Sequence, residues 1–296
     1  MKKVAIIGIG KWGKKLITKF NSLSNIVYCC DNGDKNNFLW LKENFPLINP
    51  LTNCSKVLAD KDIEIIIIAT PTITHYDLVK KALNHNKNVF VEKPLSDSLE
   101  KSKELIEMSV KNRLNLFVDN VFLYRNEFIK LKEQIKKNKV IKIIFNWEKY
   151  GTFNDSILNN LVYHDIYLFL DLFNLQNTNM KNLKIIECSK PIEKTRIDIL
   201  KFKFDYNNVL IEGNYNRVSE FKKKSIKIFL ENGEIIEWVD NNLFLNKNSI
   251  ELKENDALLD MISVFLNNNV DYNKNHFLAL KTSTFLQNIR QSLDCN

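Results

Sequence analysis

Hydrophobic residues in the first 118 positions form short runs that alternate with amphipathic stretches, which predicts alternating strands and helices. The expected strands are Val4–Ile7, Ile26–Cys30, Ile63–Thr70, Asn88–Val91 and Leu114–Val118. The expected helices lie around Lys14–Leu23, Phe38–Asn44, His75–Asn84 and Ser98–Lys111. Continuous apolar runs such as Ile65–Ile68 are typical of parallel strands covered on both faces. Residues 1–118 are therefore predicted to form an α/β domain with a doubly wound parallel sheet.

After residue 118 the pattern changes to longer segments in which apolar and polar residues alternate. The expected strands are Val140–Trp147, Thr195–Asp205, Val209–Arg217, Ser225–Leu230 and Glu234–Val239. Asn232–Gly233 between the last two indicates a hairpin. The expected helices are Phe128–Lys137, one near Leu161–Phe173, Asp256–Asn267 and Phe277–Leu293. Residues 119–296 are predicted to form an α+β domain with an open, mostly antiparallel sheet.

Composition and charge exclude several classes of protein. The 296 residues are 45% hydrophobic and 26% charged, as in ordinary globular proteins. The net charge of +8 comes from scattered lysines in short runs such as Lys222–Lys224, which are expected on solvated faces, so a nucleic acid is not an expected partner. A membrane is not expected either, because no stretch approaches the ~20 apolar residues that span a bilayer. The adjacent Cys29 and Cys30 on a predicted buried strand favour reduced thiols and a cytoplasmic protein. His85 and His276 are expected at the surface, and no metal site is expected, because no histidine and carboxylate spacing suits one.

A G-x-G-x-x-G turn directly follows the first strand, at Gly8, Gly10 and Gly13. The first glycine permits the tight turn, the second lets a pyrophosphate approach the backbone, and the third lets the next helix pack closely. The helix that begins near Lys11 offers unpaired N–H groups to the phosphates. Asp31 follows the second strand, where a carboxylate accepts hydrogen bonds from an adenosine ribose and disfavours a 2′-phosphate. The pattern predicts a Rossmann domain that binds NAD in preference to NADP.

Two further segments lie at predicted carboxyl ends of parallel strands, where such sheets bind ligands: Ala69-Thr70-Pro71-Thr72-Ile73-Thr74-His75 and Glu92-Lys93-Pro94. Pro71 and Pro94 each end a strand and restrict the residue before it. Lys93 is then a cation at the floor of a cleft, where a lysine orients a substrate hydroxyl or exchanges its proton. An ordinary surface ion pair between Glu92 and Lys93 is the alternative interpretation.

The three motifs in this order resemble the glucose–fructose oxidoreductase, inositol dehydrogenase and rhizopine-catabolism family (Gfo/Idh/MocA) over nearly the whole chain. The resemblance implies that Lys93 contacts both nicotinamide and substrate, and that Glu92 and Pro94 shape its turn with a cis Lys93–Pro94 bond. The residues expected to bind the cofactor are Gly8, Gly10, Lys11, Trp12, Gly13, Asp31, Ala69, Thr70, Pro71, Thr72, His75, Glu92 and Lys93. Thr72 departs from the family pattern, which often has Asn there.

The second-domain motif of the family, D-x-x-x-H, corresponds to Asn160–His164. His164 then matches the general acid/base, whereas Asn160 replaces the usual carboxylate with an amide that cannot take a proton. A buried core histidine or a capping histidine is the alternative for His164. Tyr124, which follows Asp119 and Asn120, is expected to stack on a sugar or bond its hydroxyl, with interdomain packing as its alternative.

Gly10-Lys11-Trp12-Gly13 and the segments 119–124 and 155–165 resemble a subgroup that acts on nucleotide-linked sugars for cell-surface polysaccharide synthesis. The implied function is hydride transfer between NAD and a secondary alcohol or ketone of such a sugar, in a homo-oligomer (dimer or tetramer). Two alternatives stay open. One is a binding or regulatory protein with weakened catalysis, which Asn160 favours, and the other is a reductase of a small non-sugar substrate such as an imine or tetrapyrrole.

Overall fold

The computed structural model describes residues 1–296 except 137, 152, 154, 174–179 and 295–296. The first of two structural units comprises Met1–Val121 and Leu258–Leu280, and the second comprises Phe122–Ala257 and Lys281–Asn296. Residues 258–280 thus lie in the unit of the N-terminal sheet, which the sequence pattern alone did not indicate. The assignment of cofactor binding to residues 1–118, and of substrate binding and oligomerisation to residues 119–296, stays a prediction.

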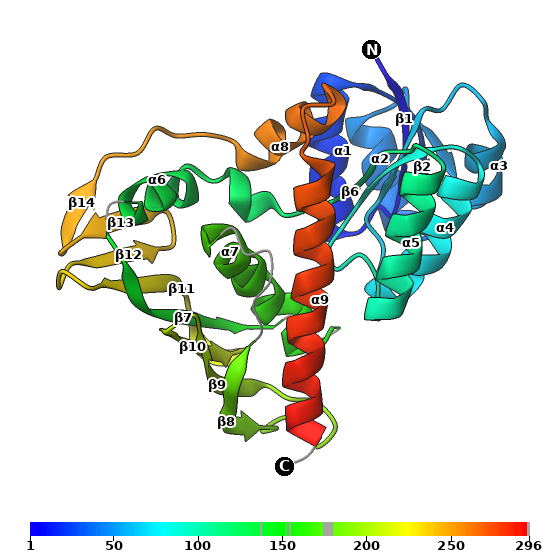
Figure 1. Ribbon diagram of the computed structural model, residues 1–296. Helices are drawn as coiled ribbons and strands as arrows, with labels where there is room; N and C mark the ends of the chain where they lie inside the picture. Colours follow the sequence, from blue (N-terminus) through cyan, green and yellow to red (C-terminus); the bar gives the residue numbers. More distant parts are fainter. Residues whose placement is uncertain (137, 152, 154, 174–179, 295–296) are drawn as a thin grey trace. The chain divides into compact units, whose positions relative to one another are not determined.

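Sheet A, the sheet of the first unit, has six parallel strands in the order β3-β2-β1-β4-β5-β6, which confirms the doubly wound α/β fold. Figure 1 draws this part of the chain in colours from blue to blue-green. Its strands are β1 (Lys3–Ile7), β2 (Asn25–Cys30), β3 (Asn49–Leu51), β4 (Ile65–Ile68), β5 (Asn88–Val91) and β6 (Leu116–Val118). The helices between them are α1 (Lys11–Leu23), α2 (Lys35–Asn44), α3 (Cys54–Ala59), η1 (Thr72–Thr74), α4 (His75–Asn84) and α5 (Leu99–Lys111). Because β1 and β4 are neighbours at the sheet centre, the chain reverses its winding there, which is where such sheets bind ligands.

Residues from the end of the chain complete the first unit. Helix α8 (Ala257–Leu266) places the Phe265 ring 5.5 Å from the rings of both Phe90 and Phe117, measured between centroids. Near the start of α9 (Tyr272–Asp294), the Asn275 amide accepts a hydrogen bond from the Val118 N–H and donates one to its carbonyl. His276 Nε2 lies 2.7 Å from the Leu116 carbonyl oxygen and is buried, so its expected place at the surface is wrong. His276 falls inside α9, one turn after the helix begins, and that turn faces β6.

Sheet B, the sheet of the second unit, has eight strands in the order β14-β13-β12-β11-β7-β10-β9-β8. Its strands are β7 (Val140–Tyr150), β8 (Lys181–Ser189), β9 (Ile199–Tyr206), β10 (Val209–Asn216), β11 (Val218–Leu230), β12 (Ile235–Val239), β13 (Asn242–Leu245) and β14 (Asn248–Ile250). Strands β7 and β10 pair in parallel and the other neighbours are antiparallel, which confirms the predicted open, mostly antiparallel sheet. Strands β11 and β12 form the hairpin predicted at Asn232–Gly233.

Helices cover one face of sheet B. They are η2 (Val121–Tyr124), α6 (Asn126–Ile135), the π-helical turn η3 (Leu158–Val162), α7 (Tyr163–Phe173) and the last part of α9. The expected end of α6 at Lys137 lies outside the described residues. Phe169 of α7 packs against Tyr206 of β9 and Phe285 of α9, with ring centroids 4.9 and 6.1 Å away.

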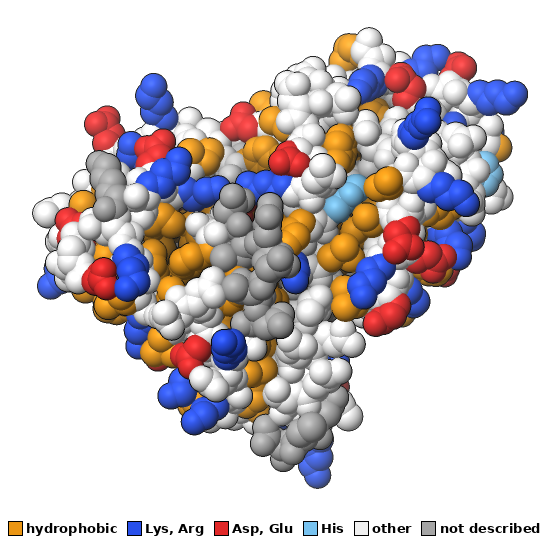
Figure 2. All heavy atoms as spheres, viewed as in Figure 1, with side chains coloured by type: hydrophobic (Ala, Val, Ile, Leu, Met, Phe, Trp, Pro, Cys, Tyr) orange, Lys and Arg blue, Asp and Glu red, His pale blue; other side chains and the backbone are white. Residues whose placement is uncertain are grey.

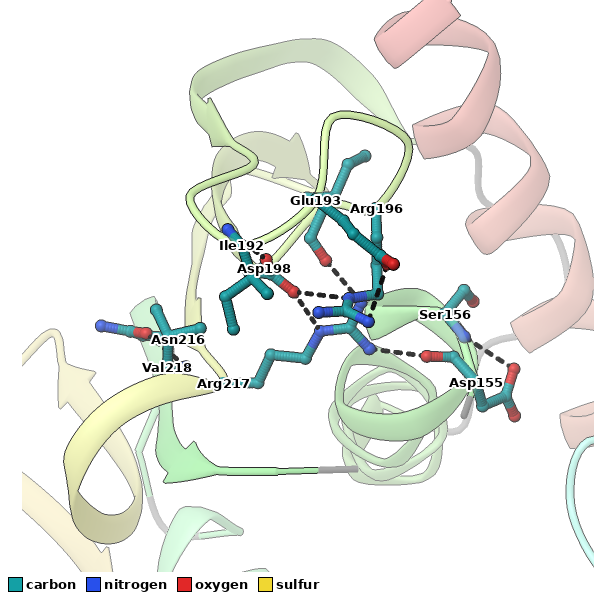
Figure 3. Close-up of polar contacts among 10 residues, drawn as sticks. Asp155, Ser156, Ile192, Glu193, Arg196, Asp198, Asn216, Arg217 and Val218 are labelled. Atoms are coloured by element: carbon teal, nitrogen blue, oxygen red, sulfur yellow. Dashed lines mark hydrogen bonds and ion pairs between the residues drawn. The ribbon is translucent and has the colours of Figure 1, made fainter. Parts of the chain in front are cut away.

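A buried ion pair joins β10, β11 and the loop before β9 (Figure 3). Arg217 and Asp198 are both fully buried, and Arg217 Nε donates to Asp198 Oδ1 over 3.0 Å. The remaining guanidinium nitrogens donate to the carbonyls of Asp155 and Ile197 over 2.6 and 2.8 Å. Arg196 adds a second hydrogen bond to Asp198 Oδ1. The arrangement satisfies the polar groups of the buried arginine, as burial of a charge requires.

Lysine and arginine side chains on the face in Figure 2 lie scattered among aspartates and glutamates. The run Lys222–Lys224 lies on β11, where Lys222 and Lys223 are exposed. Lys224 differs because its side chain is only 12% exposed, so the expectation of a solvated face is wrong for this residue.

Candidate active site

The three glycines of the loop after β1 differ in the space around them. A Cβ on Gly8, whose φ is +103°, would lie 2.4 Å from the Ala69 carbonyl oxygen, and one on Gly13 would lie 2.1 Å from the Gly8 carbonyl oxygen. A Cβ on Gly10 would meet nothing within 4 Å. Gly8 and Gly13 are thus required by packing, whereas Gly10 leaves the backbone open to a ligand at the first turn of α1.

Asp31 lies directly beside this loop. Its Oδ2 accepts a hydrogen bond from the Ile9 N–H over 2.7 Å and a longer one from Asn37 Nδ2 over 3.4 Å. Asp34 caps α2 through the N–H groups of Asn36 and Asn37, which fixes the turn that brings Asn37 to the carboxylate. Sequence reasoning did not single out Asn37, although Asp34 as a capping residue marks where α2 begins.

Lys11 and Trp12 form the start of α1. Lys11 is exposed, and the half-buried Trp12 ring lies 4.7 Å from Lys15 Nζ. The Trp12 indole N–H is buried, and no residue in the described part of the chain accepts a hydrogen bond from it. An orphaned donor beside an open helix N-terminus fits a polar ligand at this position.

The turn after β4 is held by its own hydroxyl groups. Ala69 N–H donates to the Ile7 carbonyl over 2.8 Å, and the hydroxyl oxygens of Thr70 and Thr74 lie 2.7 Å apart. Thr74 Oγ1 also donates to the Pro71 carbonyl, and Thr72 begins the short helix η1. Local hydrogen bonds therefore set the path of the chain beside the glycine loop.

His75 connects this turn to the turn after β5. The ring is 1% exposed, with Nδ1 2.8 Å from the Pro94 carbonyl oxygen and Nε2 2.8 Å from the Thr70 carbonyl oxygen. The Lys93–Pro94 bond is cis, as the family resemblance implied. Both ring nitrogens thus contact backbone, so His75 joins two segments of the predicted cofactor site, and its direct contact with cofactor stays a prediction.

Glu92 and Lys93 follow β5, and Asp119 and Asn120 follow the neighbouring β6. Lys93 is half-buried, whereas Asp119 and Asn120 are each 1% exposed. Burial and the nearby Asp119 raise the pKa of Glu92 well above its usual range, and Lys93 opposes this shift. Burial likewise raises the pKa of Asp119. The interpretation of Glu92 and Lys93 as a solvated ion pair does not fit these surroundings.

His164 lies in the first turn of α7, half-buried among aromatic side chains. The ring centroids of Phe122, Trp147 and Tyr167 lie 4.9, 5.4 and 5.7 Å from that of the imidazole. Its Nδ1 is 3.2 Å from the Tyr167 hydroxyl, which also accepts a hydrogen bond from the Phe122 N–H. The hydroxyl proton of Tyr167 can therefore point to Nδ1, which favours the tautomer with the proton on Nε2.

Asn160 and Tyr124 also belong to the second unit. Asn160 lies in the π-helical turn η3 directly before α7, a type of turn that is frequent at functional sites. Tyr124 ends η2 and is half-buried, and its carbonyl accepts a hydrogen bond from Asn255 Nδ2 over 2.8 Å.

A Lys224–Asp165 pair lies against two of the aromatic rings that contact His164, and sequence reasoning did not find it. Lys224 Nζ is 3.4 Å from Asp165 Oδ1, and lies 3.6 and 4.2 Å from the ring centroids of Phe122 and Trp147. Burial raises the pKa of Asp165 to about 6, although Lys224 opposes the shift. The period-two pattern could have indicated that Lys224 shares a sheet face with the buried Ile226, because the two are two residues apart on β11.

Comparisons with known proteins agree with this fold. Residues 2–120 match the family model GFO_IDH_MocA, described as an oxidoreductase family with an NAD-binding Rossmann fold. These residues are therefore similar to the NAD-binding domain of Gfo/Idh/MocA oxidoreductases.

Curated relatives match this chain over part of its length. An uncharacterized oxidoreductase of Schizosaccharomyces pombe is 31% identical over 100 residues, which cover 34% of this chain and 27% of the relative. The scyllo-inositol 2-dehydrogenase (NAD(+)) of Bacillus subtilis is 52% identical over 52 residues, 18% of this chain and 15% of that enzyme. The chain thus spans about a quarter or less of the length of these curated relatives.

The structure of UDP-N-acetylglucosamine 3-dehydrogenase GnnA from Acidithiobacillus ferrooxidans has the same fold over both units. Its TM-score is 0.86, with 98% of this chain and 97% of that chain covered at 16% sequence identity.

The fold of sheet A brings the predicted cofactor residues together within the first unit, at the carboxyl ends of β1, β2, β4 and β5. Of the predicted catalytic residues, Lys93 belongs to this unit, and Tyr124, Asn160 and His164 belong to the second. Among the described residues, no group of three or more His, Cys, Asp and Glu side chains is arranged to hold a metal ion. None of the described helices is long and apolar enough to cross a membrane.

Proposed function

We propose that this protein is an NAD-dependent oxidoreductase of the Gfo/Idh/MocA family that acts on a secondary alcohol or ketone of a sugar. The observation that carries the proposal is the open backbone at Gly10 beside Asp31, at the same edge of sheet A as Lys93. The names of the relatives support a polyol or sugar substrate, because one is an inositol dehydrogenase and one acts on a nucleotide-linked sugar.

NAD, when bound, accepts a hydride from an alcohol carbon, and its reduced form returns one to a ketone. The chain has groups that suit each part of the dinucleotide. The first turn of α1 and the open Gly10 suit a pyrophosphate, and the Asp31 carboxylate suits ribose hydroxyls. The acid at position 31 also repels a 2′-phosphate, which favours NAD over NADP.

We assign two side chains to the sugar hydroxyl. The Lys93 ammonium group stabilises negative charge on the reacting oxygen, and His164 removes the hydroxyl proton or returns it. The hydrogen bond to Tyr167 holds the His164 ring in one orientation. Tyr124 is assigned to the sugar ring, and Asn160 orients a hydroxyl through its amide without taking a proton.

A nucleotide-linked hexose is the substrate we propose within this class, with a place in cell-surface polysaccharide synthesis. The similarity in fold to a UDP-N-acetylglucosamine 3-dehydrogenase supports it. We also propose that the protein is cytoplasmic and forms a homo-oligomer, a dimer or a tetramer. Sheet B is proposed to form the interface between its copies.

The experiment is a substrate panel. Purified protein and NAD are mixed with nucleotide-linked hexoses, free hexoses and polyols, and reduced nicotinamide is followed by its absorbance. The proposal expects NADH with one or more nucleotide-linked hexoses. NADH only with free polyols would overturn the nucleotide-sugar assignment, and turnover only of an imine or tetrapyrrole would favour the non-sugar alternative.

Asn160 favours a second candidate, a dinucleotide-binding protein with weakened catalysis. The amide in place of a carboxylate cannot stabilise a positive charge on His164, which such a carboxylate would do. The N160D variant distinguishes the two candidates. A large gain in turnover would indicate a weakened enzyme, whereas unchanged or lower turnover would indicate that the amide belongs to the working site.

A further inference from the structure

A lysine side chain lies in the layer between sheet B and its helices. Lys224 of β11 pairs with Trp147 of β7 in the antiparallel ladder, and Ile226, two positions further along β11, is buried. Since every second residue of a strand lies on the same face, Lys224 lies on the face that the helices cover. Its side chain is only 12% exposed, and a lysine this deeply buried requires partners for its charge.

The ammonium group of Lys224 lies among one acid and three aromatic rings. Asp165 of α7 is fully buried, and its Oδ1 is 3.4 Å from Lys224 Nζ. The nitrogen also lies over the rings of Phe122, Trp147 and Trp238, at 3.6, 4.2 and 5.6 Å from their centroids. These distances are those of cation–π contacts, which extend to about 6 Å. Lys224 therefore links α7, η2, β7 and β12 through one charged group.

Three of these residues also adjoin His164. The rings of Phe122 and Trp147 contact the imidazole, with centroids 4.9 and 5.4 Å from its own, and Asp165 is the next residue along α7. Phe122 acts in a second way, because its backbone N–H donates to the Tyr167 hydroxyl, which lies 3.2 Å from His164 Nδ1. A shift of η2 would therefore change both a ring contact and a hydrogen-bond contact of the imidazole.

Loss of the Lys224 charge would affect these contacts together. The buried Asp165 carboxylate would lose its cation, which favours uptake of a proton or entry of water. Phe122 and Trp147 would lose the group that lies against both of their rings. A group that transfers a proton has to be held within a fraction of an ångström of its productive place, so a small shift of the imidazole matters.

We propose that Lys224 is a positioning residue for His164, because its ammonium group holds Asp165, Phe122 and Trp147 in the arrangement that fixes the imidazole. Lys224 acts on the reaction through these residues. The inference rests on the proposed function only for the role of His164 in proton transfer. The placement of the imidazole is a property of the second unit and requires neither cofactor nor substrate.

The first test observes the imidazole directly. In protein labelled with ¹⁵N in its four histidines, the H164N variant identifies the signals of His164. At a pH at which the imidazole is neutral, the wild type should show one tautomer, with the proton on Nε2, because Nδ1 faces the Tyr167 hydroxyl. In K224M the ring should populate both tautomers, so its two nitrogen shifts should move toward each other. Mixed tautomers in the wild type, or wild-type shifts in K224M, would overturn the proposal.

Lys227 of the same strand provides the matched control. Its Nζ is 3.1 Å from Glu237 Oε1 and 5.5 Å from the Phe229 ring centroid, so it too has a carboxylate and a ring as partners. It is three positions from Lys224 and therefore lies on the opposite face of sheet B. K227M should leave the His164 shifts at their wild-type values. An equal change in K227M would show a general effect of β11 and would contradict the proposal.

Two further variants cover the case in which K224M fails to fold. K224R keeps a cation that pairs with carboxylates and stacks on rings, so it should keep the single tautomer. K224Q retains a donor for Asp165 but removes the charge, so it should give mixed tautomers. The reverse order, or the same shifts in both variants, would count against the role of the Lys224 charge.

The role in catalysis is tested once a substrate turns over. K224M should lower kcat about 10- to 100-fold while NADH affinity is kept, because a misplacement of about 1 Å can cost about 10²-fold in rate. In an H164N background, K224M should have no further effect on kcat. An equal loss in that background would show that Lys224 does not act through His164. Absence of turnover in the wild type would count against the proposed function, whereas the histidine spectra would still test the placement of the imidazole.

Discussion

Asp31 connects cofactor choice to the geometry of the glycine loop. Its carboxylate accepts a hydrogen bond from the Ile9 N–H over 2.7 Å, so the position of the acid is fixed relative to the loop. We expect D31N to keep this backbone hydrogen bond, because an amide oxygen also accepts. The variant should bind NAD roughly 10- to 100-fold more weakly, since it loses charge-assisted hydrogen bonds to ribose hydroxyls.

The affinity for NADP should fall less than that for NAD in D31N, because the repulsion of a 2′-phosphate is removed. Isothermal titration with both dinucleotides measures the two changes. Asp62, an exposed carboxylate paired with Lys3 at the surface, provides the matched control as D62N. If D31N leaves both affinities unchanged, Asp31 does not contact the ribose.

The burial of Asp165 makes the stability of the second unit depend on pH. Its pKa is raised by burial from 3.8 to about 6, so the folded state binds more protons than the unfolded chain between these values. The contribution of the group to stability is complete below pH 3.8 and is lost as the pH rises through about 6. The wild type should lose about 3 kcal/mol of unfolding free energy relative to D165N over this range.

Urea unfolding curves of both proteins between pH 4 and pH 7 measure this difference. If the unfolding free energy of the wild type changes with pH in the same way as that of D165N, Lys224 keeps Asp165 ionised throughout this pH range, as a strong ion pair would.

At the scale of the element, two glycines of the loop after β1 serve different purposes: Gly13 is needed for packing, and Gly10 is needed for ligand binding. In G13A the new methyl group would meet the Gly8 carbonyl oxygen at 2.1 Å, a backbone atom that cannot rotate away. We expect this variant to lose about 1–3 kcal/mol of stability or more. In G10A the methyl group meets nothing within 4 Å, and the φ of −67° suits any residue, so stability should be unchanged.

G10A should nevertheless bind NADH much more weakly, because its methyl group occupies the approach of the pyrophosphate to the backbone. Thermal melting and NADH fluorescence titration of the two variants test this contrast. If G10A binds NADH with the affinity of the wild type, the phosphates of the cofactor do not bind at Gly10.

The elements that carry a clear hydrophobic period could be predicted from sequence. Strands β1, β2 and β5 and helix α4 were expected within about one residue of their observed bounds. Strand β3 and helix α3 were missed, because Asn49-Pro50-Leu51 lacks a strand pattern and the six residues of α3 are too few for a helical period. Helix α2 begins three residues earlier than expected, since its polar first turn depends on the Asp34 cap and not on burial.

The candidate site was predictable only where a motif marks it. The glycine loop, Asp31 and Glu92-Lys93-Pro94 stand at recognisable spacings after predicted strands. The partners Asp119 and Lys224 could not be assigned roles in the same way. Their importance comes from strand register and from packing across a sheet, and these relate residues that are far apart in sequence.

At the scale of the whole molecule, the second unit contains a fully buried ion pair between Arg217 and Asp198. R217M would leave the buried Asp198 carboxylate without its main partner and should lower the unfolding free energy by about 3–5 kcal/mol. R196M removes a partly exposed partner of the same carboxylate and should cost less than about 1 kcal/mol. Denaturant unfolding of both variants tests this order, and equal losses would contradict the central place of Arg217.

We propose hydride-transfer chemistry for this chain, with Lys93 acting on the reacting oxygen. The most direct measurement compares wild type and K93M in NADH affinity and in turnover of a nucleotide-linked hexose. We predict that turnover falls roughly 10²- to 10⁴-fold, as for loss of a group that acts on the proton and charge of the reacting oxygen, while NADH affinity is kept. Equal turnover in the two proteins, or loss of NADH binding that alone explains lower turnover, would contradict this assignment.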